Sequence, residues 1–161
     1  MQQGLAFLQS QLNSEEISTK HQIELLGLIG AYARMLKDFA LAQTSLNLAI
    51  KLAELIGDQK LKTKNQIRLA HVYQWQQDYR ISEKLFTDVI ASCQQNPHLK
   101  CYLDFAYQHM GKCKFDRQLY EEARYYFEQA LSLRLIKGDR SLIDSTRLAL
   151  DTINLRSQNL D

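Results

Sequence analysis

A pattern of five positions recurs three times along the chain, and this repetition constrains the fold more than any other feature. Each copy opens with a small residue, followed after nine positions by an aromatic residue, after twelve by a small residue and after sixteen by a bulky apolar residue. The copies are offset by 40 and 41 residues. The fifth position, nineteen residues after the first, is apolar. The three sets are Gly30, Phe39, Ala42, Leu46 and Ala49; Ala70, Tyr79, Ser82, Phe86 and Val89; and Gly111, Tyr120, Ala123, Phe127 and Ala130. A period in this range indicates an array of one repeated supersecondary unit.

The apolar residues within each copy are spaced by three, four and seven positions, as an amphipathic helix requires. In residues 41–53, for example, Ala42, Leu46, Ala49 and Ala53 fall on one stripe. Small residues that face one another let two antiparallel helices approach closely, and the bulky residues fill the space beside them. Each copy is therefore predicted to be a pair of antiparallel helices.

Turn and capping residues predict where these helices begin and end. Asp38 and Asp78 are suitable N-caps for the second helix of their pairs. Gly57-Asp58 and Gly138-Asp139 each combine a glycine helix terminator with an acidic N-cap, and Pro97 breaks the chain at the remaining junction. The predicted helices cover residues 2–13, 19–36, 39–56, 59–76, 79–95, 98–115, 118–137 and 140–157.

This pattern resembles the tetratricopeptide repeat, and the stretches 119–123 and 127–131 are closest to the family consensus. The resemblance covers residues 19–157 and implies an all-α fold, a right-handed α–α superhelix (solenoid) of three helix pairs with an N-terminal helix and a C-terminal capping helix. We expect residues 1–161 to form a single domain. Its repeats would span residues 19–57, 58–97 and 98–138, and the capping helix residues 140–157.

Two features depart from the usual family pattern. The family repeat is about 34 residues long, so a period of 40 to 41 implies longer helices. Val89 stands where a small residue is expected, which implies wider local packing. Long repeats with Gly-Asp junctions are similar to the tetratricopeptide domains of bacterial regulators and of kinesin light chains.

Composition narrows the class of protein further. Apolar residues make up 45% of the 161 residues and the formal net charge is +2, which argues against wholesale disorder and against a dedicated nucleic-acid binder. No stretch approaches the roughly 20 apolar residues of a membrane-spanning helix, and the N-terminus does not resemble a signal peptide. The three cysteines are well separated, as expected of free thiols in a reducing cytosol. We therefore expect a cytoplasmic protein that binds neither membranes nor nucleic acid.

The family resemblance implies a binding surface, because the first helix of each pair lines the concave face on which extended peptides bind. The candidate residues at the corresponding positions of this chain have basic, amide or aromatic side chains, and none of them is a carboxylate. The candidate ligand-binding residues are Arg34, Lys64, Arg68, His71, Gln74, Trp75, Gln108, His109, Lys112 and Phe115. This set suggests a ligand with acidic side chains or a free carboxylate.

Other interpretations of the same residues stay open at this point. Basic residues on a helix face are commonly just a solvated surface, and Trp75 is equally suited to packing against the second helix of its own pair. The positions that would match a Lys/Asn carboxylate clamp hold Gly27 and Ala31, which cannot donate such bonds. His71 and His109 lack further ligands for a metal site, so no metal or other cofactor is predicted.

The predicted function is that of a non-catalytic scaffold that binds another protein or peptide. No phosphate-binding loop, nucleophile elbow or zinc-protease motif occurs in the sequence, so an enzyme is not expected. One alternative is a structural module that self-associates or joins a larger assembly. Another is the sensor domain of a larger bacterial regulator. The sequence does not identify the partner, because one repeat scaffold serves many ligands.

Overall fold

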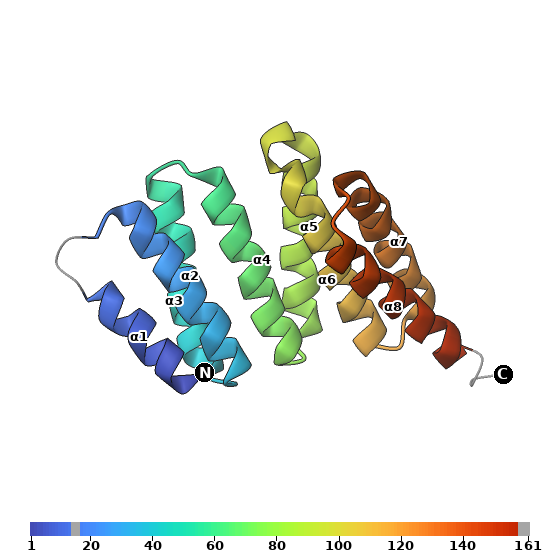
Figure 1. The fold of residues 1–161 in the computed structure, drawn as a ribbon, viewed down its shortest axis with the longest axis horizontal. Coiled ribbons are helices and arrows are strands. Elements are labelled where there is room, and N and C mark those ends of the chain that lie inside the picture. The colour runs from blue at the N-terminus through green and yellow to red at the C-terminus, as the bar shows by residue number, and fades with distance from the viewer. Residues whose placement is uncertain (14–16, 158–161) are drawn as a thin grey trace. The chain divides into compact units, whose positions relative to one another are not determined.

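The computed structural model describes residues 1–13 and 17–157, and all regular secondary structure in this part of the chain is helical (Figure 1). The elements are α1 (Gln2–Leu12), α2 (Thr19–Met35), α3 (Phe39–Leu55), α4 (Gln59–Trp75), α5 (Tyr79–Gln95), the 3₁₀ helix η1 (Pro97–Tyr102), α6 (Leu103–Asp116), α7 (Tyr120–Lys137) and α8 (Arg140–Ser157). The chain divides into two compact units, Met1–Leu85 and Phe86–Asp161, which we call unit 1 and unit 2. The all-helical fold predicted from the repeat is confirmed.

Unit 1 contains α1 to α4 and the first two turns of α5. Helix α2 contacts α1, α3 and α4, and α3 also contacts α4. Apolar clusters lie in the interior: one contains Ile23 of α2 and Ala53 of α3, and another contains Leu46 of α3 and Val72 of α4. Each helix therefore packs against its neighbours along the chain, as a stacked array requires.

Unit 2 contains the rest of α5, η1 and α6 to α8. Helix α7 packs between α6 and α8, and Ala123, Phe127 and Ile153 form a buried cluster across α7 and α8. Phe115 and Tyr120 pack against this cluster from the turn that joins α6 to α7. The helices of unit 2 thus pack in chain order, as α2, α3 and α4 do in unit 1.

The repeated small residues allow the close helix packing that the sequence predicts. A Cβ atom added to Gly30 would lie 2.4 Å from Cγ of Leu46, and one added to Gly111 would lie 2.8 Å from the ring of Phe127. Both distances are shorter than real Cβ contacts, so the bulky side chain of the second helix lies directly against the backbone of the first. The pairing inferred from the five-position pattern is therefore present in both units.

The turns also repeat. Within each helix pair the residue before the N-cap position has a left-handed backbone, with φ of 62° at Lys37, 63° at Gln77 and 61° at Gln118. Between pairs that conformation falls on Gly57 (φ 69°) and Gly138 (φ 73°). Left-handed residues commonly end helices because they allow the last carbonyl groups to be satisfied.

The predicted N-caps are confirmed. Oδ1 of Asp38, Asp58 and Asp78 accepts a hydrogen bond from the backbone N–H three residues later, at 3.1, 2.9 and 3.3 Å, and Asp139 does the same at 3.2 Å. Each cap satisfies one of the amide groups that the first turn of a helix leaves without a partner.

One predicted boundary is wrong. A helix was expected from residue 98, but residues Pro97–Tyr102 form η1 and α6 begins only at Leu103. The side chain of Asn96 accepts a hydrogen bond from the N–H of His98 at 3.0 Å, and proline at the first position fixes a tight start. This extra turn accounts for the later start of the third helix pair.

Candidate functional site

In unit 1 the structure brings together three of the predicted binding residues, Arg34 of α2 and His71 and Trp75 of α4. The guanidinium carbon of Arg34 lies 4.5 Å from the centroid of the Trp75 ring, which is the geometry of a cation–π contact. Nε1 of Trp75 donates a hydrogen bond to Nε2 of His71 at 3.1 Å, with the two rings nearly perpendicular. We call these three residues the Arg-Trp-His cluster.

The Arg-Trp-His cluster combines a held cation with exposed aromatic surface. Burial lowers the pKa of the Arg34 guanidinium from its usual value, and its Nη1 is buried without a hydrogen-bond partner among the described residues. Trp75 is 43% exposed, although tryptophan is usually largely buried. A cation held beside an exposed indole is suited to a ligand that carries both an anionic and an apolar group.

Arg68 of α4 also belongs to unit 1, and its guanidinium is positioned by contacts with Asn65 and Gly27. Its Nη1 donates to Oδ1 of Asn65 at 3.2 Å, while Nδ2 of the buried Asn65 donates to the carbonyl of Leu61 at 2.9 Å. A Cβ atom on Gly27 would lie 2.2 Å from Nη1 of Arg68, so the guanidinium packs directly against the backbone of α2. The absence of a side chain at Gly27 therefore makes room for the Arg68 guanidinium.

The remaining predicted residues of α4 differ in exposure. Lys64 is exposed, whereas Gln74 is only 7% exposed. Lys64 is thus available to a ligand, and Gln74 belongs to the interior.

The predicted residues of unit 2 have mixed environments. His109 stacks on Phe86 with ring centroids 5.9 Å apart and an angle of 9° between the rings. Phe115 meets Tyr120 edge to face at 5.5 Å, and Lys112 is half-buried. Gln108 is 3% exposed, so its side chain lies in the interior rather than at a surface.

Gln108 belongs to a buried polar network that sequence reasoning missed. Nε of Arg134 lies 3.1 Å from Oδ2 of Asp104, and these side chains are 3% and 0% exposed. Nη1 of Arg134 lies 2.9 Å from Oε1 of Gln108, 2.7 Å from Oγ1 of Thr146 and 3.1 Å from the carbonyl of Leu142. The network thus joins α6, α7 and α8.

Lys137 completes this network at its outer edge. Its Nζ contacts the second carboxylate oxygen of Asp104 and donates to the carbonyl of Cys101 at 2.6 Å. Arg134 and Lys137 both lie near the Phe105 ring, at 5.6 and 5.2 Å from its centroid. The signal in the sequence was Arg134 itself, a charged residue that continues the apolar stripe of Phe127 and Ala130.

The described residues contain no group of three His, Cys, Asp or Glu side chains that could hold a metal ion. Across residues 1–13 and 17–157, every helix is too short or too polar to cross a membrane. The arrangement offers positioned cations and aromatic rings.

No family model matches the chain, and no curated protein matches it significantly. Among the solved structures that are similar to it is "Crystal structure of BtubC (BKLC) from P. vanneervenii". That similarity has a TM-score of 0.66 at 11% sequence identity and covers 98% of this chain and 74% of the other. At this identity the similarity concerns the fold alone, and it supports the conclusion that the chain has a tetratricopeptide-like helical repeat fold.

Proposed function

We propose that this protein is a non-catalytic scaffold that binds an extended, acidic or carboxylate-bearing segment of another protein. The observation that carries the proposal is the Arg-Trp-His cluster, in which Arg34 is held over the exposed indole of Trp75. Since the side chains are already ordered by contacts within unit 1, binding would cost little conformational entropy.

Arg68 and Lys64 extend the proposed surface along α4. Arg68 is already bonded to Asn65, and a carboxylate of the ligand would add a charge-assisted bond to the same guanidinium. His109, Lys112 and Phe115 are proposed to serve the same ligand class in unit 2. Gln74 and Gln108 would act indirectly, by supporting the helices that carry the binding residues.

Trp75 makes the proposal directly testable, because it is the only tryptophan in the chain. We expect acidic peptides to change its intrinsic fluorescence in a saturable way, and neutral peptides of the same length to leave it unchanged. Arg68→Glu should weaken binding by at least tenfold, since it replaces an attractive pair by a repulsive one. Lys51→Glu, which makes the same charge change at an exposed position of α3, is the matched control.

The ligand should be sought first among cellular proteins recovered on the wild-type protein. Partners that Arg68→Glu loses and Lys51→Glu keeps would support the proposal. Equal recovery by both variants would contradict it and leave the two alternatives, a self-associating module or the sensor domain of a larger regulator.

A further inference from the structure

One face of α8 is exposed, although the equivalent face of α6 is buried. Equivalent residues of the two helices are 40 positions apart in the sequence. On α8 this face carries Asp144, whose side chain is 72% exposed, and Leu148, which is 68% exposed. Asp151 and Leu155 continue it, and both are exposed. The equivalent residues of α6 are Asp104, Gln108, Gly111 and Phe115, of which the first three are buried. Those of α4 are Thr63, Ile67, Ala70 and Gln74, which are all buried.

In α6 this face receives the second helix of its pair. Asp104 forms an ion pair with Arg134 of α7, and the Gly111 backbone lies against Phe127 of α7. Because the two helices are antiparallel, a residue near the start of α6 meets one near the end of α7. The same surface on α8 therefore has the geometry of a helix-receiving face.

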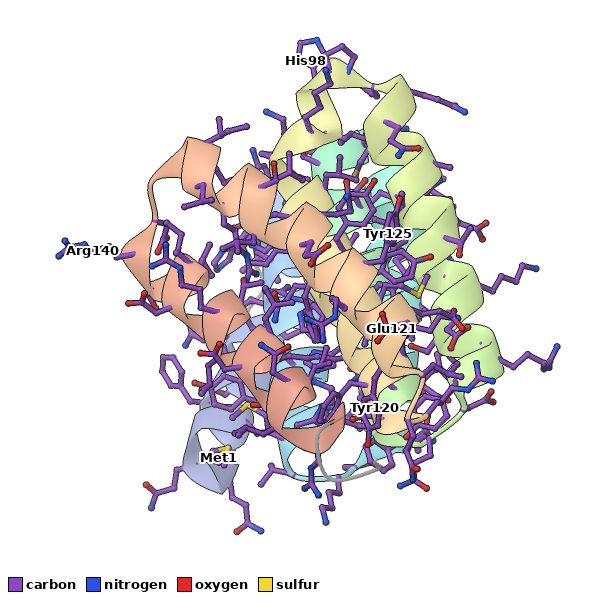
Figure 2. All side chains as sticks on the ribbon, turned by 90° about the vertical axis from the view of Figure 1, so that its right-hand side faces the viewer. Met1, His98, Tyr120, Glu121, Tyr125 and Arg140 are labelled. Carbon is purple, nitrogen blue, oxygen red and sulfur yellow. The ribbon has the colours of Figure 1, made fainter. Side chains whose placement is uncertain are left out.

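Figure 2 views unit 2 from the side on which α8 descends from Arg140 beside α7. Asp144 pairs weakly with Arg147, at 4.0 Å on its own helix, and Arg147 is itself 59% exposed. The two carboxylates are seven residues apart and thus lie on one side of α8, with Leu148 between them. This face combines apolar surface with negative charge.

We propose that the Asp144–Leu148–Asp151 face of α8 binds an amphipathic helix of a partner protein that carries two basic residues seven positions apart. The ion pair of Asp104 with Arg134 is the internal precedent for the contact at Asp144. At Asp151 the partner must differ from α7. Gly111 is the residue of α6 that corresponds to Asp151, and even a Cβ atom added to it would lie 2.8 Å from Phe127. Asp151 therefore leaves no room for an aromatic residue in this register, and the partner helix carries a basic residue opposite it instead.

Charge excludes the most obvious helix of a second copy as the occupant. Helix α1 stands first in the repeat order and contacts α2 as α7 contacts α8, yet it contains no lysine or arginine. It therefore offers nothing to the two carboxylates of α8. A basic helix from a different protein satisfies both the apolar and the charged parts of the face.

The test uses an 18-residue peptide with the α7 sequence, residues 120–137, and the substitution Phe127→Arg, which places two arginines seven positions apart. Fluorescence anisotropy at low salt should show saturable binding to the full chain. Replacing both carboxylates, Asp144→Asn with Asp151→Asn, should weaken binding about three- to tenfold, as expected for two exposed ion pairs. Leu148→Ser should weaken it about tenfold through lost apolar burial.

The matched control is Glu121→Gln with Glu128→Gln, which removes the same charge from exposed positions of α7 and should leave binding unchanged. A charge exchange adds a stricter criterion: Asp144→Arg with Asp151→Arg should bind the peptide that carries glutamate at positions 127 and 134. Arg68→Glu should not affect either result, which separates this proposal from the function proposed for unit 1.

Three outcomes would overturn the proposal. The first is no saturable binding of the peptide to the wild-type chain. The second is equal binding by the wild type and the double asparagine variant. The third is a dimer in light scattering that the double asparagine variant abolishes, because the occupant would then be a second copy of the chain.

Discussion

Helices α2, α3 and α4 of unit 1 and helices α6, α7 and α8 of unit 2 use the same packing positions for opposite chemistry. Ile23 and Ala53 lie together in an apolar cluster of unit 1. The residues 81 positions later, Asp104 and Arg134, form a buried ion pair in unit 2. The repeat therefore specifies which positions are buried and close to one another, but not whether they are apolar or charged.

A second pair of positions shows what accompanies the change. In unit 1 Gly27 lies against Asn65, whose Nδ2 bonds the carbonyl of Leu61. In unit 2 Gln108 and Thr146 occupy these positions, and the Thr146 hydroxyl lies 2.9 Å from the carbonyl of Leu142, the counterpart of Leu61. The larger, polar Gln108 supplies an acceptor to Arg134, so the buried charge is accompanied by polar neighbours.

Breaking the ion pair of unit 2 should have the largest effect. Arg134→Met leaves Asp104 with only the partly exposed Lys137, and Asp104→Leu leaves a buried guanidinium without its carboxylate. Each should lower the free energy of unfolding by about 3–5 kcal/mol, as removal of one partner from a buried pair does. Denaturant unfolding followed by circular dichroism measures this.

The double variant Asp104→Leu with Arg134→Met tests whether unit 2 tolerates the apolar chemistry of unit 1. We expect it to be more stable than either single variant, because neither buried charge remains uncompensated. A double variant that loses the full sum of the two single effects would show that the ionic interior is required by this unit.

The sequence predicts the parts of the fold that depend on size and spacing. The helix pairs, the caps at Asp38, Asp58 and Asp78, and the glycine terminators at Gly57 and Gly138 all follow from local rules of packing and capping. These features involve neighbours within a few residues or positions fixed by the period.

The polar network and the grouping of the candidate binding residues were harder to predict. The contact of Asp104 with Arg134 joins residues 30 positions apart, and its recognition required aligning the two units to see that charge replaces an apolar pair. The contact of Arg34 with Trp75 joins two different helix pairs, and nothing in the spacing of either helix specifies it. The burial of Gln108, predicted as a ligand contact, depends on that same network.

The glycines at equivalent positions of α2 and α6 should respond in the same direction but to different degrees. Gly30→Ala and Gly111→Ala should each destabilise by about 1–3 kcal/mol, since the added Cβ forces a packed side chain to shift. The cost should be larger at Gly30, where the nearest atom is 2.4 Å away, than at Gly111, where it is 2.8 Å away.

The control for this pair is Gly4→Ala in α1, where the nearest atom is 3.1 Å away on the Tyr32 ring. Its gain in helix propensity of up to about 1 kcal/mol should offset the contact. If all three substitutions gave the same change in unfolding free energy, close packing would not be the reason for the repeated glycines.

The turns should behave alike in the two units. Gly57→Ala and Gly138→Ala should each cost about 1–2 kcal/mol, because a left-handed backbone strains a residue with a Cβ atom while no side-chain contact is added. Conversely, Lys37→Gly and Gln118→Gly should each stabilise by a few tenths of a kcal/mol up to about 1 kcal/mol. Thermal unfolding of the four variants measures both signs, and a large difference between the units would show that one turn is held by contacts beyond its own backbone.

Cys93 occupies the position that holds Ala53 in unit 1 and Arg134 in α7, and its replacement by alanine should have only a small effect on stability. Burial, with a smaller contribution from the charge of Cys101, raises the pKa of Cys93 to about 11. At pH 8 only about one Cys93 thiol in a thousand is then ionised, so iodoacetamide should label the exposed Cys101 first. The labelling rate at Cys93 should rise about tenfold per pH unit while the protein stays folded. Cys93→Ala, which reproduces the residue of unit 1, should change the free energy of unfolding by less than about 1.5 kcal/mol. Labelling is measured by mass spectrometry. Rapid labelling of Cys93 at pH 8 would mean that Cys93 is open to solvent, although the equivalent residues Ala53 and Arg134 are buried.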